Sequence, residues 1–286
     1  MTRPFRDHRY TSTDGLSLFA KLYDGDPDRP ALFCMHGLTR NADDFDGLLE
    51  RLPEWRAVSV DQRGRARSDW DADGETYTPE IYCRDMLTLI DELDLDRPIA
   101  VGTSMGGLMT LMMSAMRPGL FEAAIINDIG PDVDPVGLFR LRAYVGQAMT
   151  FESWDAAAAA IRAQGPDIFP DFAPDDWMAF ARRVCAERDD GRVAFRYDPA
   201  IADGLKATDP SAVPPDLWPL YTGPEHLPML ILRGETSDIL SAETAARMQT
   251  ERKDAKLVTV PGRGHAPTLT EPVAVDAITT FLETWA

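Results

Sequence analysis

The chain has few cysteines, with only Cys34, Cys83 and Cys185 in 286 residues. Three irregularly spaced cysteines cannot form a disulfide framework and lack metal-binding spacing, so we expect a reducing compartment. The N-terminal stretch lacks the apolar segment of a secretory signal, and no apolar run is long enough to cross a bilayer. These absences predict a soluble, cytoplasmic protein.

Basic residues are also scarce, since 29 lysines and arginines face 47 acidic residues and give a net charge of −18. Such a field repels nucleic acid and anionic membranes, so neither is an expected partner. Apolar residues make up 44% of the chain and charged residues 27%, which is typical of a globular protein. We therefore expect a monomer or homodimer whose partner is a small-molecule substrate.

Short apolar runs alternate with amphipathic stretches through the first 130 residues and again after residue 228. A strand over 16–25 is expected to pair with an earlier strand through a tight turn. Thr78 and Pro79 predict the start of a helix over 78–95. Strands and helices in alternation predict a parallel sheet with right-handed crossovers. The other expected strands are 31–37, 57–64, 98–104, 121–130, 229–235 and 255–262, and the other expected helices are 42–52, 105–116, 241–252 and 271–285.

This rhythm stops between residues 132 and 225, where prolines and tryptophans interrupt helical stretches and no buried strand is evident. We expect an α/β core, residues 1–131 and 226–286, with a mainly helical insertion (residues 132–225) that caps it. A proline-rich connection over 209–228 is expected to return the chain to the core. Some aromatic residues are expected to pack the insertion, and a subset to close an apolar pocket: Phe139, Tyr144, Phe151, Trp154, Phe169, Phe172, Trp177, Phe180 and Trp218.

The stretch Gly102-Thr103-Ser104-Met105-Gly106 follows a predicted strand and begins a predicted helix. It matches G-x-S-x-G, the strand-to-helix corner that presents the serine nucleophile of α/β-hydrolases. Glycines allow strand and helix to approach closely, and the helix N-terminus favours developing negative charge. An ordinary turn with an incidental serine is the alternative, but the strand and helix on either side favour Ser104 as a nucleophile.

A serine nucleophile needs a base, and the base needs an acid to orient it. His265 lies in a loop bounded by glycine and proline after the last core strand, and we predict that it is the base. Asp238 follows the strand over 229–235 and is the predicted acid, which gives the chain order serine, aspartate, histidine. Asp128, after the strand that follows the nucleophile, is the competing candidate.

The remaining histidines and nearby acids are expected to be structural. His36 ends a strand and is expected to brace its loop. His8 and His226 are expected at the surface, and Asp61 and Asp69 in a salt-bridged loop with Arg63, Arg65 and Arg67. Two backbone N–H groups, those of Leu38 and Met105, are the predicted oxyanion hole, which leaves both apolar side chains free to line the pocket.

Five motifs stand in the order in which they occur in the α/β-hydrolase superfamily: HGLTR, DQRGRARSD, GTSMGG, RGETSD and GRGHAPTL. The chain resembles this superfamily from about residue 10 to its end. The resemblance implies a mostly parallel eight-stranded sheet, a Ser-His-Asp triad and no cofactor. The chain is similar to the esterase, lactonase and carbon–carbon bond hydrolase branches. It differs from haloalkane dehalogenases and epoxide hydrolases, which have aspartate in place of Ser104, and from HGGG-type lipases, because only Gly37 follows His36.

The expected function is hydrolysis of carboxylic esters with short to medium acyl chains, or of lactones, through an acyl-enzyme. Carbon–carbon bond hydrolysis of a diketone or ring-cleavage product could use the same triad. A ligand-sensing protein without catalysis would show a broken triad, and all three positions are intact. No metal site is expected.

Overall fold

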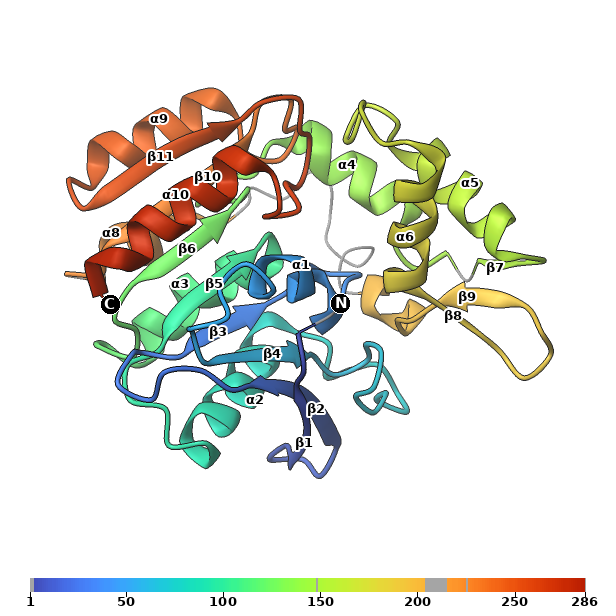
Figure 1. The fold of residues 1–286 in the computed structure, drawn as a ribbon, viewed down its shortest axis with the longest axis horizontal. Coiled ribbons are helices and arrows are strands. Elements are labelled where there is room, and N and C mark those ends of the chain that lie inside the picture. Colours follow the sequence, from blue (N-terminus) through green and yellow to red (C-terminus); the bar gives the residue numbers. More distant parts are fainter. Residues whose placement is uncertain (1–2, 148, 204–214, 225, 286) are drawn as a thin grey trace.

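A computed structural model describes residues 3–147, 149–203, 215–224 and 226–285. Residues 209–214 and 225 of the expected proline-rich connection lie outside the described residues. The central feature is an eight-stranded sheet in the order β1-β2-β4-β3-β5-β6-β10-β11 (Figure 1). Its strands are β1 (Arg6–Thr11), β2 (Ser17–Tyr23), β3 (Leu32–Met35), β4 (Ala57–Asp61), β5 (Ile99–Thr103), β6 (Ala124–Asn127), β10 (Met229–Gly234) and β11 (Ala255–Val260).

The sheet is antiparallel only at one edge, where β2 pairs with β1 and β4, and all its other pairs are parallel. The predicted mostly parallel, eight-stranded sheet is therefore confirmed. Strands β3, β4 and β6 are buried along their whole length, which explains their largely apolar sequences. Thr103 pairs with Asn127, which in turn pairs with Leu232. The residues that follow β5, β6 and β10 consequently emerge together at one edge.

Helices cover both faces of this sheet. The apolar sides of α2 (Pro79–Glu92), α3 (Met105–Met116), α8 (Trp218–Thr222) and α9 (Ala242–Glu251) join one core cluster. The opposite cluster contains η1 (Ala42–Phe45), α1 (Asp46–Leu49) and α10 (Pro272–Leu282), which η3 (Glu283–Trp285) follows. Helix α2 begins as predicted, because the Thr78 side chain accepts a hydrogen bond from the Ile81 N–H and Pro79 takes the first helical position.

The chain between β6 and β10 forms α4 (Pro135–Tyr144), α5 (Trp154–Gln164), α6 (Pro174–Val184) and η2 (Pro199–Ala202). It also forms a three-stranded antiparallel sheet from β7 (Thr150–Phe151), β8 (Cys185–Glu187) and β9 (Val193–Phe195). The sequence analysis expected no buried strand in the insertion, and these short strands, which it did not predict, are only partly buried. These strands are two or three residues long, too short to show alternation between apolar and polar residues.

Helices α4 to α6 and the small sheet lie together on one side of the eight-stranded sheet (Figure 1). They have an apolar core of their own, in which Phe169, Trp177 and Phe180 meet. Helix α8, at the end of the insertion, instead packs against α3 of the core, and its Tyr221 is buried in the core cluster. The insertion thus adds a second packed layer beside the sheet edge where β5, β6 and β10 end.

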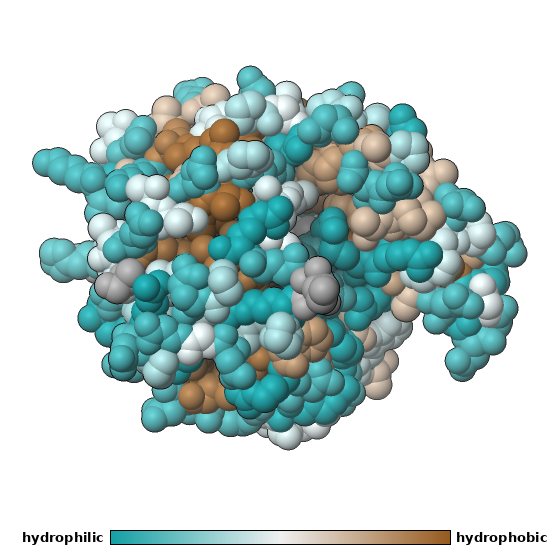
Figure 2. All heavy atoms as spheres, in the orientation of Figure 1, coloured by the Kyte–Doolittle hydropathy of each residue, from teal (hydrophilic) through white to brown (hydrophobic). Residues whose placement is uncertain are grey.

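The face in Figure 2 is mainly hydrophilic, and its apolar areas gather chiefly over α9, α10 and β11.

All three cysteines are free and buried, as expected for Cys34. No helix among the described residues is long and apolar enough to cross a membrane.

Candidate active site

Ser104 occupies a sharp turn between β5 and α3. Its backbone φ of 51° and ψ of −116° lie in a region that residues with a side chain rarely adopt. A Cβ added at Gly102 would lie 2.5 Å from the Gly106 carbonyl oxygen, and one at Gly106 would lie 2.0 Å from the Met35 carbonyl oxygen. The glycines thus permit the close strand–helix approach that the motif predicts.

His265 reaches this serine from the loop after β11. The Ser104 hydroxyl donates to Nε2 of His265 across 2.9 Å. The Asn127 side chain holds the same loop by donating to the Pro267 carbonyl at 2.9 Å. The Gly264 N–H donates to the carbonyl of Ile168 in the insertion, also at 2.9 Å. The predicted nucleophile and base therefore lie within hydrogen-bonding distance of each other.

Asp128, and not Asp238, lies against the other ring nitrogen of His265. Nδ1 donates to Asp128 Oδ2 at 2.8 Å, because a carboxylate can only accept. The Ser237 hydroxyl donates to the same oxygen at 2.7 Å, and the Gly234 N–H donates to Oδ1 at 2.8 Å. Asp128 is fully buried, and β10 holds its carboxylate from one side.

The prediction that Asp238 orients His265 is wrong in this structure. Asp238 instead pairs with Arg140 of α4, whose Nε and Nη2 donate to its two oxygens at 2.5 and 2.8 Å. Partial burial opposes ionisation of Asp238, but the Arg140 guanidinium outweighs it, so the pKa of this carboxyl lies below its ordinary value. Arg140, a residue of the insertion, therefore binds the carboxylate that the chain order favoured as the acid of the triad.

The loop after β3 places one predicted oxyanion donor, the Leu38 N–H, near the turn that holds Ser104 and the other predicted donor, the Met105 N–H. A Cβ added at Gly37 would lie 3.5 Å from Cβ of Ser104, so the peptide between Gly37 and Leu38 lies beside this serine. Among the described residues the Leu38 N–H has no hydrogen-bond acceptor. The Met105 N–H is the first of α3 and therefore has no acceptor within the helix. Both groups are free to donate to a developing oxyanion.

His36 holds this peptide from behind. Its Nδ1 donates to the Gly37 carbonyl at 2.7 Å, and its Nε2 accepts from the Gln62 N–H at 3.1 Å. Complete burial lowers the pKa of His36 to about 4, so the ring stays neutral in this arrangement. Because the Leu38 N–H belongs to the same peptide as the Gly37 carbonyl, His36 also orients that N–H. The predicted loop-bracing role of His36 is confirmed.

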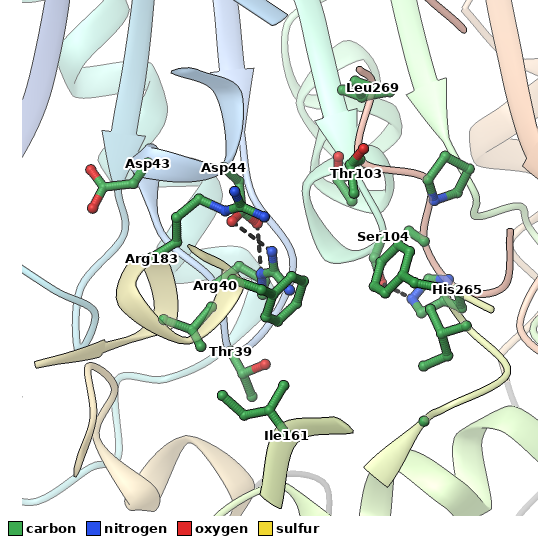
Figure 3. A pocket seen from close by; sticks show the side chains of 18 of the residues that line it. Thr39, Arg40, Asp43, Asp44, Thr103, Ser104, Ile161, Arg183, His265 and Leu269 are labelled. Carbon is green, nitrogen blue, oxygen red and sulfur yellow. Dashed lines mark hydrogen bonds and ion pairs between the residues drawn. The ribbon is translucent and has the colours of Figure 1, made fainter. Parts of the chain in front are cut away.

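The serine faces a cavity of about 590 Å³ between the sheet edge and the insertion, within the range usual for small-molecule sites. Figure 3 shows Ser104 and His265 on one side of it, and Arg40, Asp44 and Arg183 on the other. Five of the nine predicted aromatic residues line it, and Phe195 and Tyr197 are additional lining residues that the sequence analysis did not single out. The five are Tyr144, Phe169, Phe172, Trp177 and Phe180. Phe139 is 76% exposed and does not contribute.

Several ion pairs form the polar end of this cavity. Arg40 donates through two nitrogens to Asp44, each at 2.7 Å. Asp43 contacts three cations: Lys21 at 2.8 Å, Arg67 at 2.7 Å and Arg196 at 2.5 Å. Within the described residues no group of three or more histidine, cysteine or acidic side chains is placed to hold a metal ion.

The model of the "Alpha/beta hydrolase family" matches residues 32–278, which is most of the chain. The chain belongs to this α/β-hydrolase family. It is 33% identical to a 3-hydroxybutyrate-oligomer hydrolase of Cupriavidus necator over 88% of each chain. It is 30% identical to a 2-(acetamidomethylene)succinate hydrolase of Mesorhizobium japonicum, over 89% of this chain and 88% of that one. A crystal structure of an α/β hydrolase from Novosphingobium aromaticivorans DSM 12444 matches with 44% identity, 99% coverage of each chain and a TM-score of 0.93.

The other candidates of this α/β hydrolase lie away from the serine. His8 bonds to Glu92 at 2.9 Å, and His226 is exposed. Asp61 pairs with Arg67 at 2.6 Å, as expected, whereas Asp69 accepts from the Ser17 N–H. The loop's other two arginines do not pair with these acids: Arg63 pairs with Asp14 and Asp85, and Arg65 donates to the Leu38 and Arg63 carbonyls.

Proposed function

We propose that this α/β hydrolase is a serine hydrolase that cleaves carboxylic esters of short to medium acyl chains, or lactones. The observation that carries the proposal is the hydrogen-bonded chain from Ser104 through His265 to Asp128, beside two free backbone N–H groups. This arrangement has the parts that acyl transfer requires, namely a nucleophile, a base, an orienting acid and an oxyanion hole.

In the proposed mechanism, Asp128 holds His265 in the tautomer that leaves Nε2 free to accept a proton. Nε2 takes the Ser104 proton as Oγ attacks the ester carbonyl carbon, and the Leu38 and Met105 N–H groups bind the oxyanion. His265 then returns the proton to the departing alcohol. A water molecule activated by His265 attacks the acyl-enzyme, and its collapse releases the acid and regenerates Ser104.

The cavity and one relative support the proposed size and type of substrate. Its volume of about 590 Å³ and its aromatic lining suit a small, partly apolar substrate better than a long glyceride. The relative from Cupriavidus necator acts on 3-hydroxybutyrate oligomers, whose units are joined by ester bonds, and this supports an ester substrate. The insertion supplies most of the aromatic lining and thus is proposed to set specificity.

The test is hydrolysis of 4-nitrophenyl esters from acetate to dodecanoate by the wild type and by Ser104→Ala. We expect faster turnover of short and medium chains, and a loss of at least about a thousandfold in kcat for Ser104→Ala. Near-normal turnover by a folded Ser104→Ala protein would contradict the proposal. If no ester or lactone reacts, release of acid from a vinylogous 1,5-diketone would identify carbon–carbon bond hydrolysis instead.

A further inference from the structure

Three arginines line the cavity, and two of them are already paired. Arg40 is bound to Asp44, and Arg140 is bound to Asp238. The third, Arg183 in the last turn of α6, has no ion pair and no side-chain hydrogen bond within the described part of the chain. Its guanidinium therefore has all its donors available to a molecule in the cavity.

The carboxylates near Arg183 do not neutralise it, because each has another cation. Asp44 accepts both hydrogen bonds from Arg40. Asp46 accepts from Lys21 at 2.7 Å and from the Tyr23 hydroxyl at 2.6 Å, and Asp43 contacts Lys21, Arg67 and Arg196. At the polar end of the cavity, the guanidinium of Arg183 is thus the positive charge that takes part in none of these ion pairs.

The backbone of Arg183 is held by hydrogen bonds, although its guanidinium is free. Its carbonyl accepts hydrogen bonds from the Asn41 side chain at 2.8 Å and from Arg196 at 3.3 Å. The centroid of the Phe180 ring lies 4.1 Å from the guanidinium carbon of Arg40 and 5.4 Å from that of Arg183. The backbone of α6 therefore holds this half-buried cation at the cavity, and its guanidinium can form a two-donor hydrogen bond with a planar anion such as a carboxylate.

Burial affects this charge as expected for a cation without a close partner. It lowers the pKa of Arg183 from its ordinary value, and the neighbouring Arg40 acts in the same direction, although Asp44 opposes the shift. An incoming carboxylate would reverse this penalty. Two other carboxylates line the cavity, but Asp176 and Glu50 are exposed to solvent, where their charges are screened.

Figure 3 shows Arg183 across the cavity from Ser104 and His265. An ester whose carbonyl lies at Ser104 would therefore extend its far end toward this guanidinium. We propose that Arg183 binds a carboxylate on the substrate, and that the enzyme acts on esters that carry a negative charge. This inference rests on the proposed ester hydrolysis at Ser104 and adds the class of substrate.

The experiment compares esters that differ only in charge. One series is the monoethyl esters of succinic, glutaric and adipic acids, each paired with its carboxamide. A second pair, the acetate ester of 4-hydroxybutanoate and its carboxamide, places the charge on the alcohol side. Acid release is followed in a pH-stat at constant ionic strength. We expect the wild type to prefer at least one carboxylate ester over its carboxamide, despite the protein's net charge of −18. Arg183→Gln is expected to lower kcat/KM for that carboxylate ester by about 10- to 100-fold.

Arg182→Gln is the matched control. Arg182 is the preceding residue of α6, is exposed, and has its guanidinium 4.7 Å from the Trp154 ring rather than in the cavity. This variant is expected to retain the preference, and Arg183→Lys to retain part of it. In Arg183→Gln the carboxamides are expected to lose much less kcat/KM than the carboxylates, because a neutral amide makes a weaker hydrogen bond to arginine.

Equal rates for carboxylate and carboxamide in the wild type, or an equal loss for both in Arg183→Gln, would overturn the carboxylate site and leave ester hydrolysis standing. If a folded wild type cleaves none of these esters, and no 4-nitrophenyl ester or lactone either, the proposed function fails instead. Calorimetry with Ser104→Ala then decides the site independently. Tighter binding of monoethyl glutarate than of its carboxamide, lost when Arg183→Gln is added, would support it, and equal binding would overturn it.

Discussion

Asp128 Oδ2 accepts the Nδ1 hydrogen of His265 at 2.8 Å, while Asp238, after the next strand of the sheet, is bound to Arg140. The two aspartates are thus distinguished by their partners. Of the two, Asp128 is the one placed to fix the tautomer of His265, the proposed base, and to stabilise its positive charge.

Asp128→Asn is therefore expected to lower kcat by about ten-thousandfold, because an asparagine side chain can donate to Nδ1 and favours the wrong tautomer. Asp238→Asn is the matched control and is expected to lower kcat by less than about tenfold. Steady-state hydrolysis of a short 4-nitrophenyl ester measures both. A larger loss for Asp238→Asn than for Asp128→Asn would reverse the assignment.

The Arg140–Asp238 pair is expected to add little stability. Both side chains are about a quarter exposed, at 27% and 29%, and ion pairs of this exposure contribute about 0–1 kcal/mol. Arg140→Gln is accordingly expected to change the free energy of unfolding by no more than about 1 kcal/mol, measured by urea denaturation. A loss of several kcal/mol would show that the pair is a main anchor of α4.

Gly106→Ala tests the close approach of α3 to β3. The added methyl group would lie 2.0 Å from the Met35 carbonyl oxygen, which belongs to the backbone and cannot rotate away. We expect a loss of about 1–3 kcal/mol or more in the free energy of unfolding. Gly37→Ala is the control, since its Cβ would make an ordinary 3.5 Å contact with Ser104 and stability should stay near the wild-type value. Equal stability of the two variants would refute the packing argument.

His36→Leu is expected to lower kcat by about 10- to 100-fold, because the Leu38 N–H would lose the hydrogen bond that orients its peptide. KM is expected to change less, since the oxyanion forms only after substrate binds. Esterase kinetics distinguish this from simple destabilisation when unfolding curves confirm that the variant is folded at the assay temperature. An unchanged kcat in the folded variant would show that His36 is not needed to orient the Leu38 N–H.

His36 also predicts how stability changes with pH. Its pKa is about 4 in the folded protein and about 6.5 when exposed, so between these values the unfolded state binds more protons. The free energy of unfolding is expected to fall by about 3 kcal/mol through this group as the pH drops from about 7 to about 4. Urea midpoints of wild type and His36→Gln across this range provide the measurement. A parallel decline in both proteins would assign acid sensitivity to other groups.

The sequence pattern could predict those parts of the molecule that depend on residues close together in the chain. The buried strands are apolar along their length, and the elbow requires glycines on both sides of Ser104. The choice between the two candidate acids could not be predicted in this way. Asp128 and Asp238 follow adjacent parallel strands, so both lie at the same edge of the sheet. What separates them is Arg140, 98 residues from Asp238 in sequence, and no pattern along the chain shows that contact.

Arg183 was missed for the same reason. Its sequence position, in a helical stretch with arginine beside it, is typical of a solvated surface. Its distinctive property is the absence of a close partner among the described residues, and this depends on which cations Asp43, Asp44 and Asp46 bind. The short strands β7, β8 and β9 were missed because they are recognised by pairing rather than by sequence.

The hydrogen bond from Gly264 to Ile168 ties the loop of the base to the insertion. The two backbones lie so close that a Cβ at Gly264 would be 3.0 Å from the Ile168 Cα. A motion that carried Ile168 away to admit a bulky substrate would break this bond and release one support of His265. Wide opening of the insertion would therefore loosen the loop of His265, so access to the cavity and the position of the proposed base both depend on this one contact.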